Sequence, residues 1–149
     1  MATQSSNVLT MLQDLASKEV DEAALALAKA MKLAHEALVK QEMLNEYRLD
    51  YVRNLNKLLE TGMGAESYQN FQNFFGKLDQ AIAGQQQVVE MANQQVKVHK
   101  QLWQESQRKK LSYEVLTNRS EKRMLKVEQK KDQKLMDEFA MRITRTKHQ

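Results

Sequence analysis

The 149-residue sequence contains no proline and has only four glycines: Gly62, Gly64, Gly76 and Gly84. Proline breaks the interior of helices, and both residue types favour turns, so the chain has few places where it can change direction. The abundant residue types include Ala, Leu, Glu, Gln, Lys and Met, all of which have high helix propensity. The sequence therefore predicts an all-α fold made of few, long helices.

A seven-residue repeat of apolar side chains runs through the first part of the chain. Its members are Leu9, Ala16, Ala23, Ala30, Ala37, Leu44, Tyr51 and Leu58. Apolar residues three or four positions further on widen this repeat to one helix face: Leu12, Val20, Leu27, Leu33, Ala34, Tyr47 and Leu55. The pattern predicts a first helix from about residue 7 to about residue 60, with Ser5, Ser6 or Asn7 as its N-cap.

The segment Thr61-Gly62-Met63-Gly64 places two glycines after the last residue of this repeat, which predicts a turn over residues 61–66. A second helix is expected from about residue 67 to about residue 143. Its apolar stripe is interrupted by Gln85, His99 and Ser106 and consists of Tyr68, Phe71, Phe75, Leu78, Ile82, Val89, Ala92, Val96, Trp103 and Tyr113.

A short connection between two long helices favours antiparallel packing at a shallow left-handed crossing angle. We therefore expect residues 1–149 to form a single coiled-coil domain, a long two-helix antiparallel hairpin. The alanines of the repeat should allow close approach and should face residues 90–111, where the bulky Trp103 lies. Because the second helix is the longer one, about 25 residues at its end should project as a basic overhang.

Several classes of function are disfavoured by the sequence. It has no cysteine, which excludes disulfides and thiolate metal sites and fits a reducing compartment. It shows neither a signal peptide nor an apolar stretch long enough to span a membrane, so we expect a soluble cytoplasmic protein. A two-helix hairpin offers no enclosed pocket, the histidines His35, His99 and His148 are far apart, and there is no phosphate-binding loop. We therefore expect no enzymatic activity, cofactor or metal.

The charge of the chain is unevenly distributed. Residues 1–99 carry 9 Lys/Arg against 12 Asp/Glu, whereas residues 100–149 carry 14 against 7. The basic end is consistent with docking on an acidic protein surface, with a solvated helix face, or with binding to nucleic-acid phosphates. Acidic residues dilute the positive charge there, which disfavours nucleic acid: Glu128, Asp132, Asp137 and Glu138.

An aromatic group follows the turn and consists of Tyr68, Phe71, Phe74 and Phe75. Two adjacent phenylalanines cannot share one narrow seam, so we expect Phe74 to lie on an exposed flank with Leu78 and Ala81. The first helix offers a similar flank with Leu44, Tyr47 and Tyr51. These rings either close the end of the hairpin or form a binding patch.

The chain resembles the flagellar FliJ family, the small coiled-coil component of the bacterial flagellar type III export apparatus. The resemblance spans nearly the whole chain, and its most specific segments are Leu15 to Val20, Tyr51 to Asn56, Tyr68 to Phe74 with Leu78 and Ala81-Ile82, and Asp132 to Ala140. It implies a hairpin similar to the rotor stalk of rotary ATP synthases. It also implies a role in ring assembly of the hexameric export ATPase, in coupling that ATPase to the cytoplasmic domain of the export gate, and in escorting export chaperones at the inner membrane.

The resemblance also suggests site residues. The family's pattern for binding the gate falls on Leu44, Tyr47, Tyr51, Phe74, Leu78 and Ala81, while Lys40 and Gln85 depart from it. By region, the candidates for contact with the ATPase are Arg123, Lys126, Lys130 and Phe139. The alternatives are a general helical adaptor, a similar stalk from a virulence-type secretion system, or a basic hairpin that binds nucleic acid non-specifically.

Overall fold

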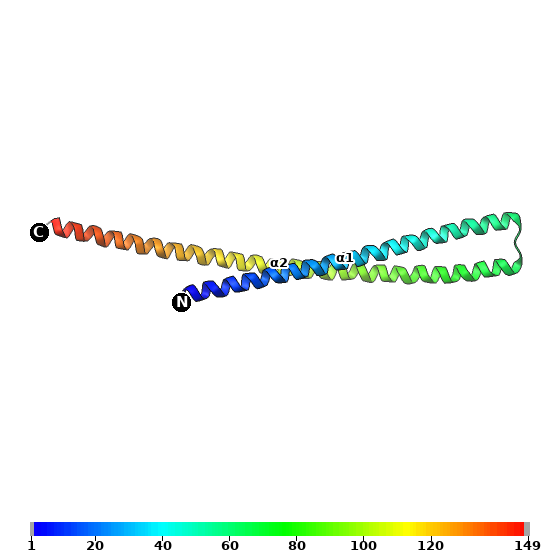
Figure 1. Ribbon diagram of the computed structural model, residues 1–149, viewed down its shortest axis with the longest axis horizontal. Coiled ribbons are helices and arrows are strands. Elements are labelled where there is room, and N and C mark those ends of the chain that lie inside the picture. Colours follow the sequence, from blue (N-terminus) through cyan, green and yellow to red (C-terminus); the bar gives the residue numbers. More distant parts are fainter. Residues whose placement is uncertain (1, 148–149) are drawn as a thin grey trace. The chain divides into compact units, whose positions relative to one another are not determined.

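A computed structural model describes residues 2–147 of the chain and confirms the all-α fold class. Helix α1 spans Ala2–Thr61 and helix α2 spans Ala65–Lys147 (Figure 1). Helix α1 begins earlier than the expected residue 7, because the preceding residues include no proline or glycine that would stop a helix. For the same reason α2 continues beyond residue 143. None of the described helices has a stretch both long and apolar enough to cross a membrane.

The turn between the helices is shorter than expected, since only residues 62–64 lie outside a helix. Gly62 has a φ of 97°, the left-handed conformation in which glycine avoids the clash that a Cβ atom causes. The hydroxyl of Thr61 donates to the carbonyls of Lys57 at 3.3 Å and Leu58 at 3.2 Å, which satisfies acceptors in the last turn of α1. Helix α2 opens with a hydrogen bond from the Tyr68 amide to the Gly64 carbonyl at 3.1 Å.

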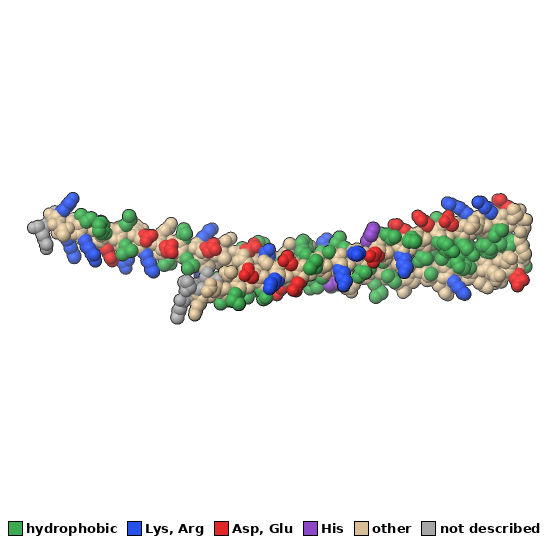
Figure 2. Space-filling model, viewed as in Figure 1, with side chains coloured by type: hydrophobic (Ala, Val, Ile, Leu, Met, Phe, Trp, Pro, Cys, Tyr) green, Lys and Arg blue, Asp and Glu red, His purple; other side chains and the backbone are tan. Residues whose placement is uncertain are grey.

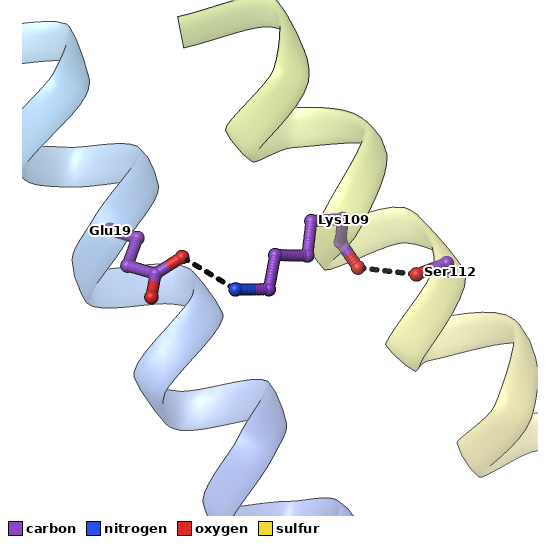
Figure 3. Close-up of polar contacts among 3 residues, drawn as sticks. All are labelled: Glu19, Lys109 and Ser112. Atoms are coloured by element: carbon purple, nitrogen blue, oxygen red, sulfur yellow. Dashed lines mark hydrogen bonds and ion pairs between the residues drawn. The ribbon is translucent and has the colours of Figure 1, made fainter. Parts of the chain in front are cut away.

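The chain consists of two units: residues 21–104, which include the turn, and residues 1–20 together with 105–149. In the first unit Ala37 of α1 is hydrogen-bonded to Gln85 of α2, and Arg48 of α1 to Asp79 of α2. A higher residue number on α1 is thus paired with a lower residue number on α2. In the second unit Lys109 contacts Glu19 at 3.3 Å (Figure 3). Thr117 contacts Gln13, also at 3.3 Å. The two helices are therefore antiparallel in each unit.

The seam between the helices is narrow. Among the described residues, the buried hydrophobic side chains are Ala16, Val20, Ala30, Ala37 and Leu78. Four of them lie on α1, and three belong to the seven-residue repeat. Leu33, Tyr47 and Leu58 were expected on the buried face and are instead 54%, 52% and 42% exposed. A single partner helix covers only the central positions of a stripe, and its outer positions remain in contact with water.

Ala30 lies opposite α2 residues that fall within the expected range of 90–111. Ala26, Ala30 and Ala92 line a hollow of about 330 Å³ together with Lys29, Leu33, Gln95 and His99. On the α2 side of this hollow the small Ala92 lies together with the larger Gln95 and His99. The antiparallel register sets this pairing, and a single helix's repeat does not reveal it.

Candidate protein-docking surfaces

Five rings gather where the hairpin closes, and we call them the aromatic cluster: Tyr47, Tyr51, Phe71, Phe74 and Phe75. Tyr51 lies at its centre, with its ring centroid 4.4 Å from Phe74, 5.0 Å from Phe71 and 5.4 Å from Phe75. Separations of this size are typical of favourable stacked and edge-on aromatic pairs. Figure 2 shows hydrophobic side chains concentrated on the visible face near the turn. The cluster therefore holds α1 and α2 together at this end.

The expectation that Phe74 points away from the seam is wrong. Both Phe74 and Phe75 are half-buried, and both contact Tyr51: Phe74 with tilted rings and Phe75 edge-on. Two adjacent rings of α2 therefore share one partner on α1. Tyr68 was expected in the seam but is 41% exposed.

The six candidate gate-binding residues divide by exposure. Tyr47 is 52% exposed and Ala81 is also exposed, whereas Leu44, Tyr51 and Phe74 are half-buried. Leu78 is only 7% exposed, which confirms its predicted place in the apolar stripe of α2 and shows that it does not also lie on an exposed flank. It lies one turn after both Phe74 and Phe75, and since both of these rings turn toward α1, Leu78 follows them into the seam. Tyr47 and Ala81 are thus the most accessible of the six.

An ion pair that the sequence patterns did not indicate lies beside this cluster. The Arg48 guanidinium donates from Nε to Oδ1 of Asp79 at 2.7 Å and lies 5.8 Å from the centroid of the Phe75 ring. The hydrogen bond to Asp79, and then its negative charge, raise the pKa of Arg48 above its ordinary value. Both side chains are about half exposed, so the pair specifies register more than it adds stability.

The two positions that depart from the family pattern differ in their surroundings. Lys40 is exposed, whereas Gln85 is half-buried and donates from Nε2 to the carbonyl oxygen of Ala37 at 2.9 Å. Ala37 lies on α1 and is 8% exposed, so this hydrogen bond is a contact between the two helices within the seam. Gln85 is a polar residue at a seam position of the α2 stripe, and such a position is the sequence signal for a contact of this kind.

A second candidate surface is the end of α2, residues 121–147, which we call the overhang. Every one of these residues is exposed, and α2 continues past the N-terminal end of α1 (Figure 1). The candidate residues Arg123, Lys126, Lys130 and Phe139 all lie here. The overhang carries nine Lys/Arg and five Asp/Glu, and none forms an ion pair with another described residue. Its cations are therefore available to a partner.

The apolar side chains of the overhang form a short stripe. Leu135, Met136 and Phe139 are 64%, 74% and 66% exposed, and they border a hollow of about 520 Å³ together with Glu138 and Arg142. Positions 131 and 134, which continue the seven-residue spacing from the seam residues Tyr113 and Thr117, are lysines. Charged residues therefore interrupt the seven-residue spacing of the seam just before this stripe.

Potential metal ligands are dispersed in the described part of the chain. Residues 2–147 contain no group of three or more His, Cys, Asp or Glu side chains that could hold a metal ion. His35 is exposed, His99 is half-buried beside the small hollow in the seam, and His148 lies outside the described residues.

Together the fold and these surfaces define a class of protein, an all-α helical hairpin with an aromatic cluster at its turn and an exposed basic helix end. Comparison with known proteins identifies a family. The family "Flagellar FliJ protein" matches residues 5–149. The "Flagellar FliJ protein" of Escherichia coli (strain K12) is 32% identical over 139 residues, which cover 93% of this chain and 95% of that protein. The protein of the same name from Salmonella typhi matches with the same identity and coverage.

The chain therefore belongs to the flagellar FliJ protein family. Membership makes it a flagellar export-related protein.

Proposed function

We propose that this protein binds the hexameric flagellar export ATPase as a central stalk, promotes assembly of the ATPase ring, and couples the ring to the cytoplasmic domain of the export gate. The observation that carries this proposal is that the chain offers two different candidate docking surfaces, one on each of its two units. These are the aromatic cluster near the turn and the overhang of α2.

The overhang supports the part of the proposal that concerns the ATPase. An isolated amphipathic helix end gains little stability in water, because most helical stability in proteins comes from packing of the apolar face. The stripe formed by Leu135, Met136 and Phe139 would be covered by docking inside a ring. The unpaired cations, among them Arg123, Lys126 and Lys130, would meet acidic groups of the ATPase subunits.

The aromatic cluster supports the part of the proposal that concerns the gate. Its half-buried rings fix the geometry of the closed end, while Tyr47 and Ala81 remain exposed. The Phe74 ring lies 6.3 Å from the Tyr47 ring, and Ala81 follows Phe74 by seven positions on the same face of α2, so Tyr47 and Ala81 lie on one side of the hairpin. A rigid aromatic side chain on a preorganised scaffold is a common anchor of protein interfaces.

Two further roles complete the proposal. Escort of flagellar export chaperones requires only another docking surface on the same hairpin, and the protein acts in the cytoplasm at the periphery of the inner membrane. Non-specific binding of nucleic acid by the basic overhang is the competing function, which acidic residues such as Asp132 and Asp137 disfavour.

Gate binding is tested by substitution at exposed positions, because Leu78→Ala would also remove buried packing. We expect Tyr47→Ala combined with Ala81→Glu to weaken binding to the isolated cytoplasmic domain of the gate protein at least tenfold, about 1.4 kcal/mol, in a titration calorimeter. The matched control is Val88→Glu, at an exposed position of α2 in the same unit. Unchanged affinity of the double variant, with unchanged helicity, would show that this surface does not bind the gate.

Nucleic-acid binding is tested separately with a labelled DNA duplex. The proposal predicts no saturable binding at physiological salt. Micromolar binding that falls steeply as salt rises would instead support the competing function.

A further inference from the structure

Helix α2 carries another apolar surface, before the overhang, that neither proposed partner uses. Leu111, Val115 and Leu116 are 59%, 42% and 46% exposed. They line a shallow hollow of about 530 Å³ together with Ser112 and two arginines, Arg108 and Arg119. We call these six residues the arginine-flanked face.

The spacing of this face follows one side of the helix. Arg108, Leu111, Val115 and Arg119 are separated by three, four and four positions, so they form one row with an arginine at each end. The two arginines are eleven positions apart, which corresponds to about 16 Å along the helix axis at 1.5 Å per residue. The face therefore has an apolar centre about two turns long between two positive charges.

The cations of this face are not used within the hairpin. The neighbouring Lys109 reaches toward α1 and contacts Glu19 at 3.3 Å, while the Ser112 hydroxyl donates to the carbonyl of Lys109 at 2.7 Å (Figure 3). Neither Arg108 nor Arg119 forms an ion pair with another described residue. Each guanidinium retains its five donors for a carboxylate of a partner.

We propose that the arginine-flanked face binds an acidic amphipathic helix of another protein. A row of side chains along a helix presents ridges and grooves that a second helix fills, and a helix with apolar residues at its centre would cover Leu111 and Val115. Carboxylates about eleven residues apart on that helix would meet Arg108 and Arg119.

Charge argues against a second copy of this chain as the occupant. Two copies that pair antiparallel about a two-fold axis at the centre of the row would place Arg108 of one copy beside Arg119 of the other, and the reverse. Like charges in direct contact oppose association. The proposal does not depend on the ATPase or the gate, because its residues belong to neither of the surfaces described above.

The test uses the full chain and two labelled helical peptides that share the same leucine stripe. One peptide has glutamates eleven positions apart, and the other has lysines at the same places. Fluorescence anisotropy should show saturable binding of the glutamate peptide and binding of the lysine peptide at least tenfold weaker. The double variant Arg108→Glu with Arg119→Glu should reverse this order, and Val115→Glu should weaken both peptides. Met91→Glu, at a 70% exposed position of α2 in the other unit, is the matched control.

Three results would overturn the proposal. The first is no saturable binding of the glutamate peptide to the unmodified chain. The second is a preference that the double charge reversal leaves unchanged, which would place the peptide elsewhere. The third is a dimer in light scattering that Val115→Glu dissociates, which would make a second copy the occupant.

Discussion

Replacement of Tyr51 by alanine should destabilise the hairpin more than any other single change in the aromatic cluster. Its ring lies within 6.1 Å of four others, and three of those centroids are within 5.4 Å. Truncation of a fully buried large aromatic side chain costs about 3–5 kcal/mol. Tyr51 is half-buried, so about half of that applies, and the lost ring pairs add about 0.5–1.5 kcal/mol. We expect the free energy of unfolding to fall by about 2–4 kcal/mol.

Two control variants separate the ring from its surroundings. Tyr51→Phe keeps the ring and removes a hydroxyl that forms no hydrogen bond with another described residue, so the change should be about 0.5 kcal/mol or less. Tyr47→Ala removes a ring that is 52% exposed and whose two ring neighbours are 6.1 Å and 6.3 Å away. It should lower the free energy of unfolding by about 1 kcal/mol or less.

The assay is equilibrium urea unfolding followed by helical circular dichroism, with the free energies compared at a common m-value. The reasoning is refuted if Tyr51→Ala destabilises the protein no more than Tyr47→Ala does. The central position of Tyr51 in the aromatic cluster would then add nothing to the free energy of unfolding.

Two further changes test the turn and the seam. Gly62→Ala should destabilise the protein by about 1–2 kcal/mol because the φ of 97° strains any residue with a Cβ atom. Gly64→Ala should change the stability little, because a Cβ atom there meets no atom within 4 Å and Gly64 has no positive φ. Thermal unfolding compares the two variants. Ala16→Leu should lower the free energy of unfolding by about 1–3 kcal/mol, because Ala16 is 2% exposed and a larger side chain would push the helices apart. Ala28→Leu on the exposed face should be nearly neutral. Urea midpoints that shift equally for both variants would contradict this account of the seam.

The fold was predictable from local signals that act in the same direction. Proline is absent, apolar residues recur every seven positions, and glycines occur together only at residues 62 and 64, so one turn between two helices is the simple solution. The exact helix ends were less predictable, because nothing near residue 2 or residue 147 terminates a helix.

The surfaces were less predictable because they depend on how two distant segments align. The pattern assigned Phe74 to an exposed flank, but the register turns its ring toward Tyr51 of α1. The contact between Arg48 and Asp79 joins residues 31 positions apart, and no periodicity of either helix indicates it. By contrast, the exposure of Phe139 followed from helix length alone, since α1 is the shorter helix.

The central claim is that the overhang binds the export ATPase and promotes ring assembly. The most direct measurement is the hexamer content and ATP hydrolysis rate of the cognate flagellar export ATPase, titrated with this protein, with its Met136→Glu/Phe139→Glu variant, and with Met141→Glu. Met141 lies two positions beyond Phe139, on the opposite side of the helix, and is 69% exposed, so it serves as the matched control. The account predicts that the unmodified protein and the control promote hexamers and stimulate hydrolysis, while the double variant does neither. Equal stimulation by all three, or stimulation by none, would contradict it.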